Sequence, residues 1–235
     1  MTELLYLKDH YLREFEAEVV KVENNFIVLN KTCFYPVSGG QLGDHGTIKK
    51  GEETFHVIHV KKSNNDIYHH VDKVGLKKGD KIVGIIDWER RYKLMRAHTA
   101  AHILSQVIHK ETSTLITGNQ LDLDKIRIDF SLESLDREKI LNYIEKTNEI
   151  INEDLQVTTE FKTREEALKI PQISKLAMGL PQGIKEVRIV KIGDFDLQAD
   201  AGTHVNSTKE IGKIEFIKTE NKGKDKKRIY CRIKD

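Results

Sequence analysis

Short segments of alternating apolar and polar residues, separated by turn residues, fill the first 90 positions and restrict this part of the chain to a β-rich fold. Two pairs of such segments, within 15–29 and 54–71, flank turns that contain consecutive asparagines, a pattern typical of hairpins. A Lys-Lys-Gly-Asp turn then leads into a further strand over 81–87. Several short strands at this spacing predict a small β-barrel. Four histidines in these strands are interpreted as cross-strand surface pairs rather than as metal ligands: His56, His59, His69 and His70.

The length of 235 residues exceeds the usual size of one domain, so we expect two packed domains, a barrel domain over 1–88 and a second domain over 89–235. Hydrophobic residues at 38% and charged residues at 32% are typical of a protein with a well-hydrated surface. The longest apolar runs, such as 82–86, are too short to cross a membrane, and the N-terminus has no signal-peptide pattern. Cys33 and Cys231 have no metal-like spacing, which predicts free thiols in a reducing, cytoplasmic compartment.

Beyond position 89 helices alternate with strands, which together with the barrel predicts an α+β fold. We expect a helix that runs to about residue 110, followed by a loop over 112–118. Ser134 is expected to cap the next helix, and Thr163 with Glu166 has the form of a capping box. Further strands are predicted over 125–130, 157–162, 187–192, 213–218 and 228–233.

One segment, 32–46, does not resemble an ordinary barrel strand, because four of the fifteen glycines of the chain fall within eight of its residues. Glycine allows a close approach of the backbone to another surface and a positive φ angle. Packing of this loop against the second domain and contact with a polar ligand both explain the composition. The segment is not a phosphate-binding loop, because it lacks the Gly-Lys-Ser/Thr end.

A pair of histidines, His98 and His102, lies in the strongest helical segment of the chain. Residues four apart lie one above the other on a helix, so both rings can reach the same divalent cation. Taken alone, this pair is equally compatible with two surface or half-buried histidines.

A second motif about 100 residues later supplies a third histidine, His204, and a carboxylate, Asp200. Three imidazoles and one carboxylate oxygen form a plausible zinc site. If Asp200 does not bind the ion, the fourth position is open to water or substrate, which is the arrangement of hydrolytic zinc enzymes.

These two motifs, His-Thr-Ala-Ala-His at 98–102 and Gly-Thr-His-Val at 202–205, resemble the editing domain of alanyl-tRNA synthetase. The glycine-rich segment at 34–41 is similar to that of the free-standing editing proteins called AlaX, and the resemblance covers nearly the whole chain. Further motifs follow in the order typical of that family: Asp87-Trp88 with Arg91, Arg127–Phe130 and Lys209–Gly212.

The resemblance to the medium-length AlaX type implies a small β-barrel domain packed on an editing domain in which helices cover an antiparallel sheet. It implies hydrolysis of the ester of mischarged tRNA(Ala), chiefly seryl-tRNA(Ala) and sometimes glycyl-tRNA(Ala), while alanyl-tRNA(Ala) is spared. It also implies one zinc ion per chain, a tRNA partner and neither DNA nor membrane as a partner. A class II synthetase core does not fit in this length, and the oligomeric state, monomer or dimer, stays open.

The chain departs from the family at Asp200, where the second motif usually has a cysteine that ligates the metal. Aspartate either ligates zinc directly, or holds a water or a histidine N–H from outside the ligand shell. The ion either lowers the pKa of a bound water or orients the terminal adenosine and aminoacyl group. Since Thr99 rather than glutamate follows His98, the general base of His-Glu-x-x-His proteases is missing.

Rejection of alanine requires a group that hydrogen-bonds the serine hydroxyl, because such a site leaves its own polar groups unpaired when the hydroxyl is absent. Our candidates for binding the substrate, and for any catalytic contact besides the metal, are Thr32 and Gln41. Gln198 and Thr203 are expected near the metal, and Gly39 with Gly40 at the mouth of the pocket.

Between Lys218 and Lys234 eight basic residues face two acidic ones, and the 222–228 hairpin with Arg96 is a candidate for contact with the acceptor stem. A hairpin tip kept soluble by lysines explains this segment equally well.

Two other functions remain open from the sequence. A zinc hydrolase of small esters or amides would act without tRNA. An editing-domain relative inactivated by loss of the thiolate would bind tRNA without deacylating it.

Overall fold

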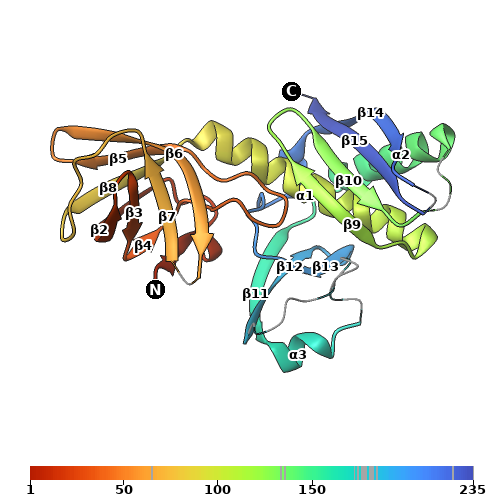
Figure 1. The fold of residues 1–235 in the computed structure, drawn as a ribbon. Coiled ribbons are helices and arrows are strands. Elements are labelled where there is room, and N and C mark those ends of the chain that lie inside the picture. The colour runs from red at the N-terminus through yellow and green to blue at the C-terminus, as the bar shows by residue number, and fades with distance from the viewer. Residues whose placement is uncertain are drawn as a thin grey trace. The chain divides into compact units, whose positions relative to one another are not determined.

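The computed structural model describes residues 1–64, 66–132, 134, 136–171, 173, 175, 179, 183, 185–223 and 225–234. The chain divides into two compact units, Met1–Leu94 and Met95–Asp235, and each is described by itself (Figure 1). The division falls within the longest helix, α1 (Trp88–Thr112). Strands dominate the first unit, while helices and antiparallel sheets share the second, so the predicted α+β class is confirmed. Within the described residues, no helix combines the length and apolar character needed to span a membrane.

The N-terminal unit is a closed antiparallel barrel, as the strand spacing predicts. Its strands follow the order β2-β3-β7-β6-β5-β8. They are β2 (Glu14–Glu23), β3 (Phe26–Leu29), β5 (Gly46–Lys50), β6 (Glu53–Ser63), β7 (Asp66–Val71) and β8 (Lys81–Ile86). The short strands β1 (Glu3–Leu4) and β4 (Lys31–Thr32) pair in parallel, and a 3-10 turn, η1 (Leu5–Leu7), follows β1. Sequence patterning missed β5, because Ile48 is its one fully buried apolar side chain and no alternation results.

His69 is the one barrel histidine whose predicted surface position is wrong. It alternates with outward-facing neighbours on β7 and is fully buried in the barrel interior. Its Nδ1 lies 3.2 Å from the carbonyl oxygen of Ile27, which can only accept, so Nε2 is the acceptor for the hydroxyl of Thr32 at 2.8 Å. Burial lowers the pKa of His69 to about 4, so the ring is neutral at pH 7. The cross-strand pair of His59 with His70 is present as predicted.

The glycine-rich segment forms a tight hairpin. The backbones of Ser38 and Gln41 exchange hydrogen bonds of 3.2 and 2.9 Å around Gly39 and Gly40. Both glycines have positive φ, +59° and +83°, the combination that a two-residue type I′ turn requires. Turn geometry alone therefore accounts for this glycine pair.

A fully buried ion pair ties this hairpin to the start of α1. The Arg91 guanidinium contacts both carboxylate oxygens of Asp44, and Nη2 also donates to the carbonyl of Cys33 at 2.6 Å. The Asp44 carboxylate in turn accepts the backbone N–H of Tyr35 at 2.6 Å. Neither charged side chain has measurable exposure. One arginine thus joins three stretches of chain within the N-terminal unit.

In the residues that the structure describes, the C-terminal unit consists of the remainder of α1, two antiparallel sheets and three shorter helical segments. The larger sheet has the order β14-β15-β10-β9 and the smaller one β11-β12-β13. The strands are β9 (Ile116–Leu121), β10 (Ile126–Phe130), β11 (Val157–Thr163), β12 (Glu186–Ile192), β13 (Asp196–Ala199), β14 (Lys213–Asn221) and β15 (Lys227–Lys234). The helices are α2 (Arg137–Asn152), α3 (Arg164–Leu168) and the 3-10 turn η2 (Thr208–Ile211). Helix α2 packs against β14.

Two details differ from the sequence-based expectation. Asp136, not Ser134, is the N-cap of α2, because its carboxylate accepts the backbone N–H of Lys139 at 2.8 Å. The expected loop over 112–118 ends early, since β9 begins at Ile116 and pairs with β10. The capping box that opens α3 is confirmed.

Replacing Asp44 with Asn is expected to destabilise the protein by about 3–5 kcal/mol, because the Arg91 charge would stay buried without its partner. Urea unfolding followed by tryptophan fluorescence measures this change. Glu89→Gln, which removes an exposed partner of Lys93 on the same helix, is the matched control and should cost less than about 1 kcal/mol. Equal effects of the two variants would contradict a special role for the buried pair.

Candidate metal centre

Helix α1 supplies the first two residues of the site. His98 and His102 lie one turn apart, with ring centroids 5.1 Å from each other. The helix is buried along this stretch, including Ala97, Ala101 and Leu104, so both rings lie inside the unit. Their exposed fractions are 2% and 7%. Histidines on a surface stripe are therefore excluded as an interpretation of this motif.

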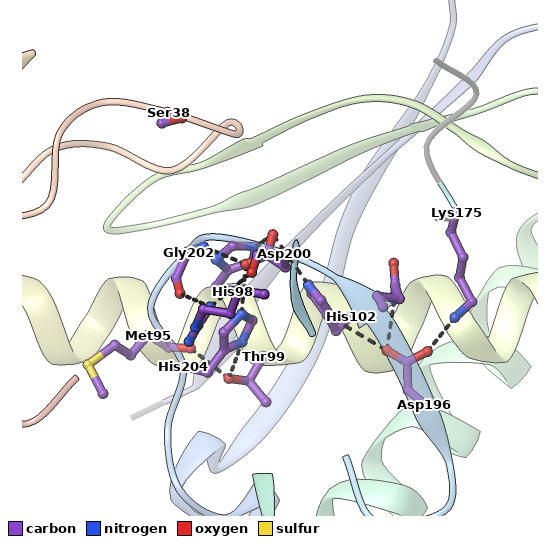
Figure 2. Close-up of polar contacts among 12 residues, drawn as sticks. Ser38, Met95, His98, Thr99, His102, Lys175, Asp196, Asp200, Gly202 and His204 are labelled. Carbon is purple, nitrogen blue, oxygen red and sulfur yellow. Dashed lines mark hydrogen bonds and ion pairs between the residues drawn. The ribbon is translucent and has the colours of Figure 1, made fainter. Parts of the chain in front are cut away.

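The loop after β13 supplies the other two residues, Asp200 and His204. Arg188, from the neighbouring strand β12, shapes this loop by donating from Nη1 to the carbonyl oxygens of Asp200 and Gly202, each at 3.0 Å. The His204 ring reaches a centroid distance of 4.4 Å from His98 and 4.7 Å from His102. The two motifs thus meet in one cluster, as Figure 2 shows.

The geometry of these four side chains fits a metal ion. The Asp200 oxygens lie 3.1 Å from Nε2 of His204, 3.4 Å from Nε2 of His98 and 3.9 Å from Nε2 of His102. One donor atom from each residue falls within 4.8 Å of all the others. Ligand atoms around a tetrahedral zinc with bonds near 2.0–2.1 Å are separated by roughly 3.4 Å. The donors are therefore nearly at ligand spacing.

Thr99 fixes which nitrogen His204 presents to the cluster. Its hydroxyl donates to the Met95 carbonyl at 3.0 Å, so its oxygen is an acceptor for other groups. That oxygen lies 3.2 Å from Nδ1 of His204 and 3.3 Å from the backbone N–H of Val205. Nδ1 of His204 therefore carries the proton, and Nε2 presents its lone pair to the cluster.

Asp196 has the corresponding position behind His102. Its Oδ2 lies 3.3 Å from Nδ1 of His102 and accepts the Gln198 amide at 2.7 Å. The other oxygen forms an ion pair with Lys175, and both charged side chains are almost completely buried. Figure 2 shows the carboxylate between the lysine and the ring. A carboxylate in this position orients a ligand histidine and increases its basicity.

The charges of the cluster shift the pKa values of its members. Burial would raise the pKa of Asp200, but the three imidazoles, His98 foremost, lower it well below its usual range. Burial lowers the pKa of His204 well below its usual value. Burial also disfavours the charged form of His102, yet Asp196 and Asp200 outweigh it and raise its pKa to about 9. The carboxylate is therefore ionised at neutral pH.

Gly202 is required by the close approach of the loop to helix α1. A Cβ atom at this position would overlap the His98 ring. The glycine of the Gly-Thr-His motif thus leaves room for a ligand side chain, and the following residue, Thr203, is completely buried.

The other predicted substrate residues lie in the N-terminal unit or support the cluster. Thr32 and Gln41 are both fully buried in the N-terminal unit, whereas Gly39 and Gly40 form the exposed hairpin turn. Gln198 contacts the cluster indirectly, through Asp196. Their roles toward a substrate stay predictions.

Sequence reasoning missed three supporting residues. Thr99 lies inside the first motif and Asp196 lies four residues before Asp200, so their positions in the sequence could have indicated a role beside the ligands. Lys175 had no such signal, because only the fold brings it to Asp196.

The chain is similar to known proteins over its whole length. Residues 4–90 match the family of class II (A) tRNA synthetases, and residues 187–230 match the second additional domain of threonyl and alanyl tRNA synthetases. Alanyl-tRNA editing protein AlaX-M of Methanosarcina barkeri is 46% identical over 243 residues, and that of Saccharolobus solfataricus is 45% identical over 238 residues. Both alignments cover 100% of each chain. The alanine–tRNA ligase of Sulfurisphaera tokodaii is 38% identical over 225 residues, 93% of this chain and 25% of the ligase.

Asp196→Asn is expected to weaken zinc binding by about 10–100-fold, because the charged group 3.3 Å from Nδ1 of His102 is lost and no longer increases the basicity of the ring. Competition with a chromophoric chelator measures the affinity. Asp194→Asn is the matched control, since that carboxylate is 99% exposed and pairs with Lys191. Unchanged zinc affinity in the Asp196 variant would show that the carboxylate does not support the metal centre.

Proposed function

Because the chain belongs to the AlaX-M family of alanyl-tRNA editing proteins, we propose that it hydrolyses seryl-tRNA(Ala) and glycyl-tRNA(Ala) in trans and leaves alanyl-tRNA(Ala) intact. The observation that carries this proposal is the buried cluster of His98, His102, Asp200 and His204, assembled from two distant segments in a chain related over its full length. That relationship favours a tRNA ester over a small ester as the substrate. A cytoplasmic location follows from the proposed substrate.

We propose zinc as the metal, held by the three imidazoles and by Asp200 as the fourth ligand. Nitrogen donors with one carboxylate suit zinc, and the contact of Asp200 with all three rings supports direct ligation rather than a role outside the ligand shell. A bound zinc ion would supply Lewis-acid chemistry to water or to the ester, or an anchor for the 3′ end of the tRNA.

The side chains of the protein prepare this site in two ways. Thr99 fixes the tautomer of His204, and Asp196 lies 3.3 Å from the outer nitrogen of His102, so both rings face the centre. Asp200 is the most exposed of the four, with a fifth of its side chain accessible, and therefore marks the side from which substrate and water enter. In the reaction water adds to the ester carbonyl, the bond to the ribose oxygen breaks and that oxygen takes a proton. Ionised Asp200 can accept a proton or bind a cation but cannot act as the acid.

Thr32 is our candidate for recognition of the serine hydroxyl. Its hydroxyl proton is donated to His69, and its oxygen already accepts the backbone N–H of Phe34 at 3.1 Å. One lone pair is left, so Thr32 could only accept a hydrogen bond, which the seryl hydroxyl can donate and the alanyl methyl cannot. Gln41 is the second candidate.

The proposal predicts rapid deacylation of seryl-tRNA(Ala), slower deacylation of glycyl-tRNA(Ala) and negligible deacylation of alanyl-tRNA(Ala). Release of radiolabelled amino acid measures all three rates. The chelator dipicolinate should lower the rate of seryl-tRNA(Ala) deacylation at least about tenfold, because it removes zinc from the ligand residues. Added zinc should bind these residues again and restore the rate. Equal turnover of a small seryl ester would favour a general zinc hydrolase. Absence of deacylation with every metal tested would indicate a binding module.

Thr32→Val is expected to lower seryl-tRNA(Ala) hydrolysis at least about tenfold, because the hydrogen-bond acceptor is lost. Zinc content should stay unchanged. Thr32→Ser keeps the hydroxyl and is the matched control for the polar contact, and urea unfolding of both variants reports the loss of the His69 partner. Wild-type hydrolysis by the valine variant would remove Thr32 from the recognition site.

A further inference from the structure

The outward face of the larger sheet in the C-terminal unit carries a concentration of positive charge. We call the outward side chains of β10, β14 and β15, together with Lys222 directly after β14, the basic face. Strand register places them together: Arg127 lies opposite Tyr230, and Tyr230 opposite Lys218. The inward residues of the same strands, such as Ile128 and Ile229, belong to the buried core. The basic face is thus a polar layer on one side of a well-packed sheet.

On this face each of three carboxylates lies between two cations. Glu220 contacts Lys218 at 2.6 Å and Lys222 at 2.8 Å. Glu215 contacts Arg232 at 3.1 Å and Lys234 at 3.2 Å. Each group keeps a net positive charge, because one carboxylate cannot neutralise two cations. The carboxylates therefore hold the cations in place without cancelling the charge.

The third group is the most buried. Asp129 accepts two hydrogen bonds from Arg228, at 2.6 and 2.8 Å, and lies 4.0 Å from Nε of Arg127. Among the described residues, that Nε is buried and has no hydrogen-bond partner. Arg127 is held by its Nη1 bond to Gln120, so its guanidinium plane is fixed in place.

The three groups together are more positive than the chain as a whole. Six cations surround three carboxylates, whereas the formal net charge of the whole chain is +2. The rest of the chain therefore has slightly more acidic than basic residues. Lys218, Arg232 and Lys234 are the most accessible of the six, with side chains 57–62% exposed.

An aromatic ring lies among these cations. The Nζ of Lys218 is 4.9 Å from the Tyr230 ring centroid, and the Tyr230 hydroxyl donates to Glu220 at 3.3 Å. Fixed guanidinium groups, exposed lysines and an aromatic hydroxyl are side chains that contact phosphate and ribose in nucleic-acid complexes.

We propose that the basic face is a docking surface for the phosphate backbone of tRNA. The choice of tRNA as the polyanion rests on the proposed editing function. Charge complementarity carries the assignment, since a rigid row of excess cations gains affinity by releasing counterions from a polyphosphate. The exposed cations lie along the strands, so the contact extends beyond the 222–228 hairpin tip, where Lys227 is engaged by Asn221 and Gly223.

The test compares two triple variants of the full chain. Lys218→Gln with Arg232→Gln and Lys234→Gln removes the accessible cations of the basic face. Lys139→Gln with Lys146→Gln and Lys169→Gln is the matched control, because each of these lysines pairs with one carboxylate elsewhere in the same unit. Binding of uncharged tRNA(Ala) is measured by filter retention across a series of KCl concentrations, with zinc content and urea unfolding as checks of folding.

The basic-face variant is expected to bind uncharged tRNA about 10–100-fold more weakly, and its plot of log Kd against log salt should be shallower by about two, since each phosphate contact contributes about 0.7–0.9 to that slope. The control should behave as the wild type. Wild-type affinity and slope in the basic-face variant, or an equal loss in the control, would overturn the proposal.

Binding of uncharged tRNA does not depend on hydrolysis, so the two proposals fail separately. A wild-type protein that binds tRNA through this face but deacylates nothing would refute the editing reaction alone. If the wild-type protein deacylates its substrate and the basic-face variant binds tRNA with unchanged affinity, the docking surface alone is refuted.

Discussion

The convergence of three buried imidazoles on one carboxylate is the interaction on which the functional half of this protein depends. Neutral rings that turn their lone pairs toward a common point repel one another, and burial removes the water that would screen them. Asp200 supplies negative charge at that point, and His102, with a pKa raised to about 9, supplies a proton when no cation is present. A divalent cation can take the place of that proton. The cluster therefore fits a metal ion in its electrostatics as well as in its spacing.

In each unit a buried ion pair joins segments that are distant in sequence. Arg91 and Asp44 connect the start of α1 to the glycine-rich hairpin, and Lys175 and Asp196 connect the chain before β12 to strand β13, which precedes Asp200 and His204. Such pairs contribute little net stability compared with apolar packing, but a single unpaired partner is costly. We infer that they select one arrangement of the chain, and in the C-terminal unit that arrangement also orients His102.

Carboxylates and histidines have different roles at different places in this protein. Buried carboxylates such as Asp196 are fully engaged and orient a neighbour, whereas the half-buried Glu215 and Glu220 leave excess positive charge on the sheet. The environment therefore decides whether a carboxylate shapes a site or a surface. Histidine behaves likewise, since His69 is a neutral core residue and His204 is a candidate metal ligand.

Regular spacing along the chain was sufficient for the barrel class and for the helix that carries His98 and His102, although it missed strand β5. The two motifs were paired by the family resemblance. Periods of two and of 3.6 residues are local properties, so they can be read without the fold. The error at Ser134 is local, since Asp136 two residues later caps the helix, whereas the error at His69 and the unrecognised partners Asp196 and Lys175 have a common cause. Which polar side chain is buried, and which charge it meets, depends on residues far away in sequence, and folding alone brings those residues within hydrogen-bond distance.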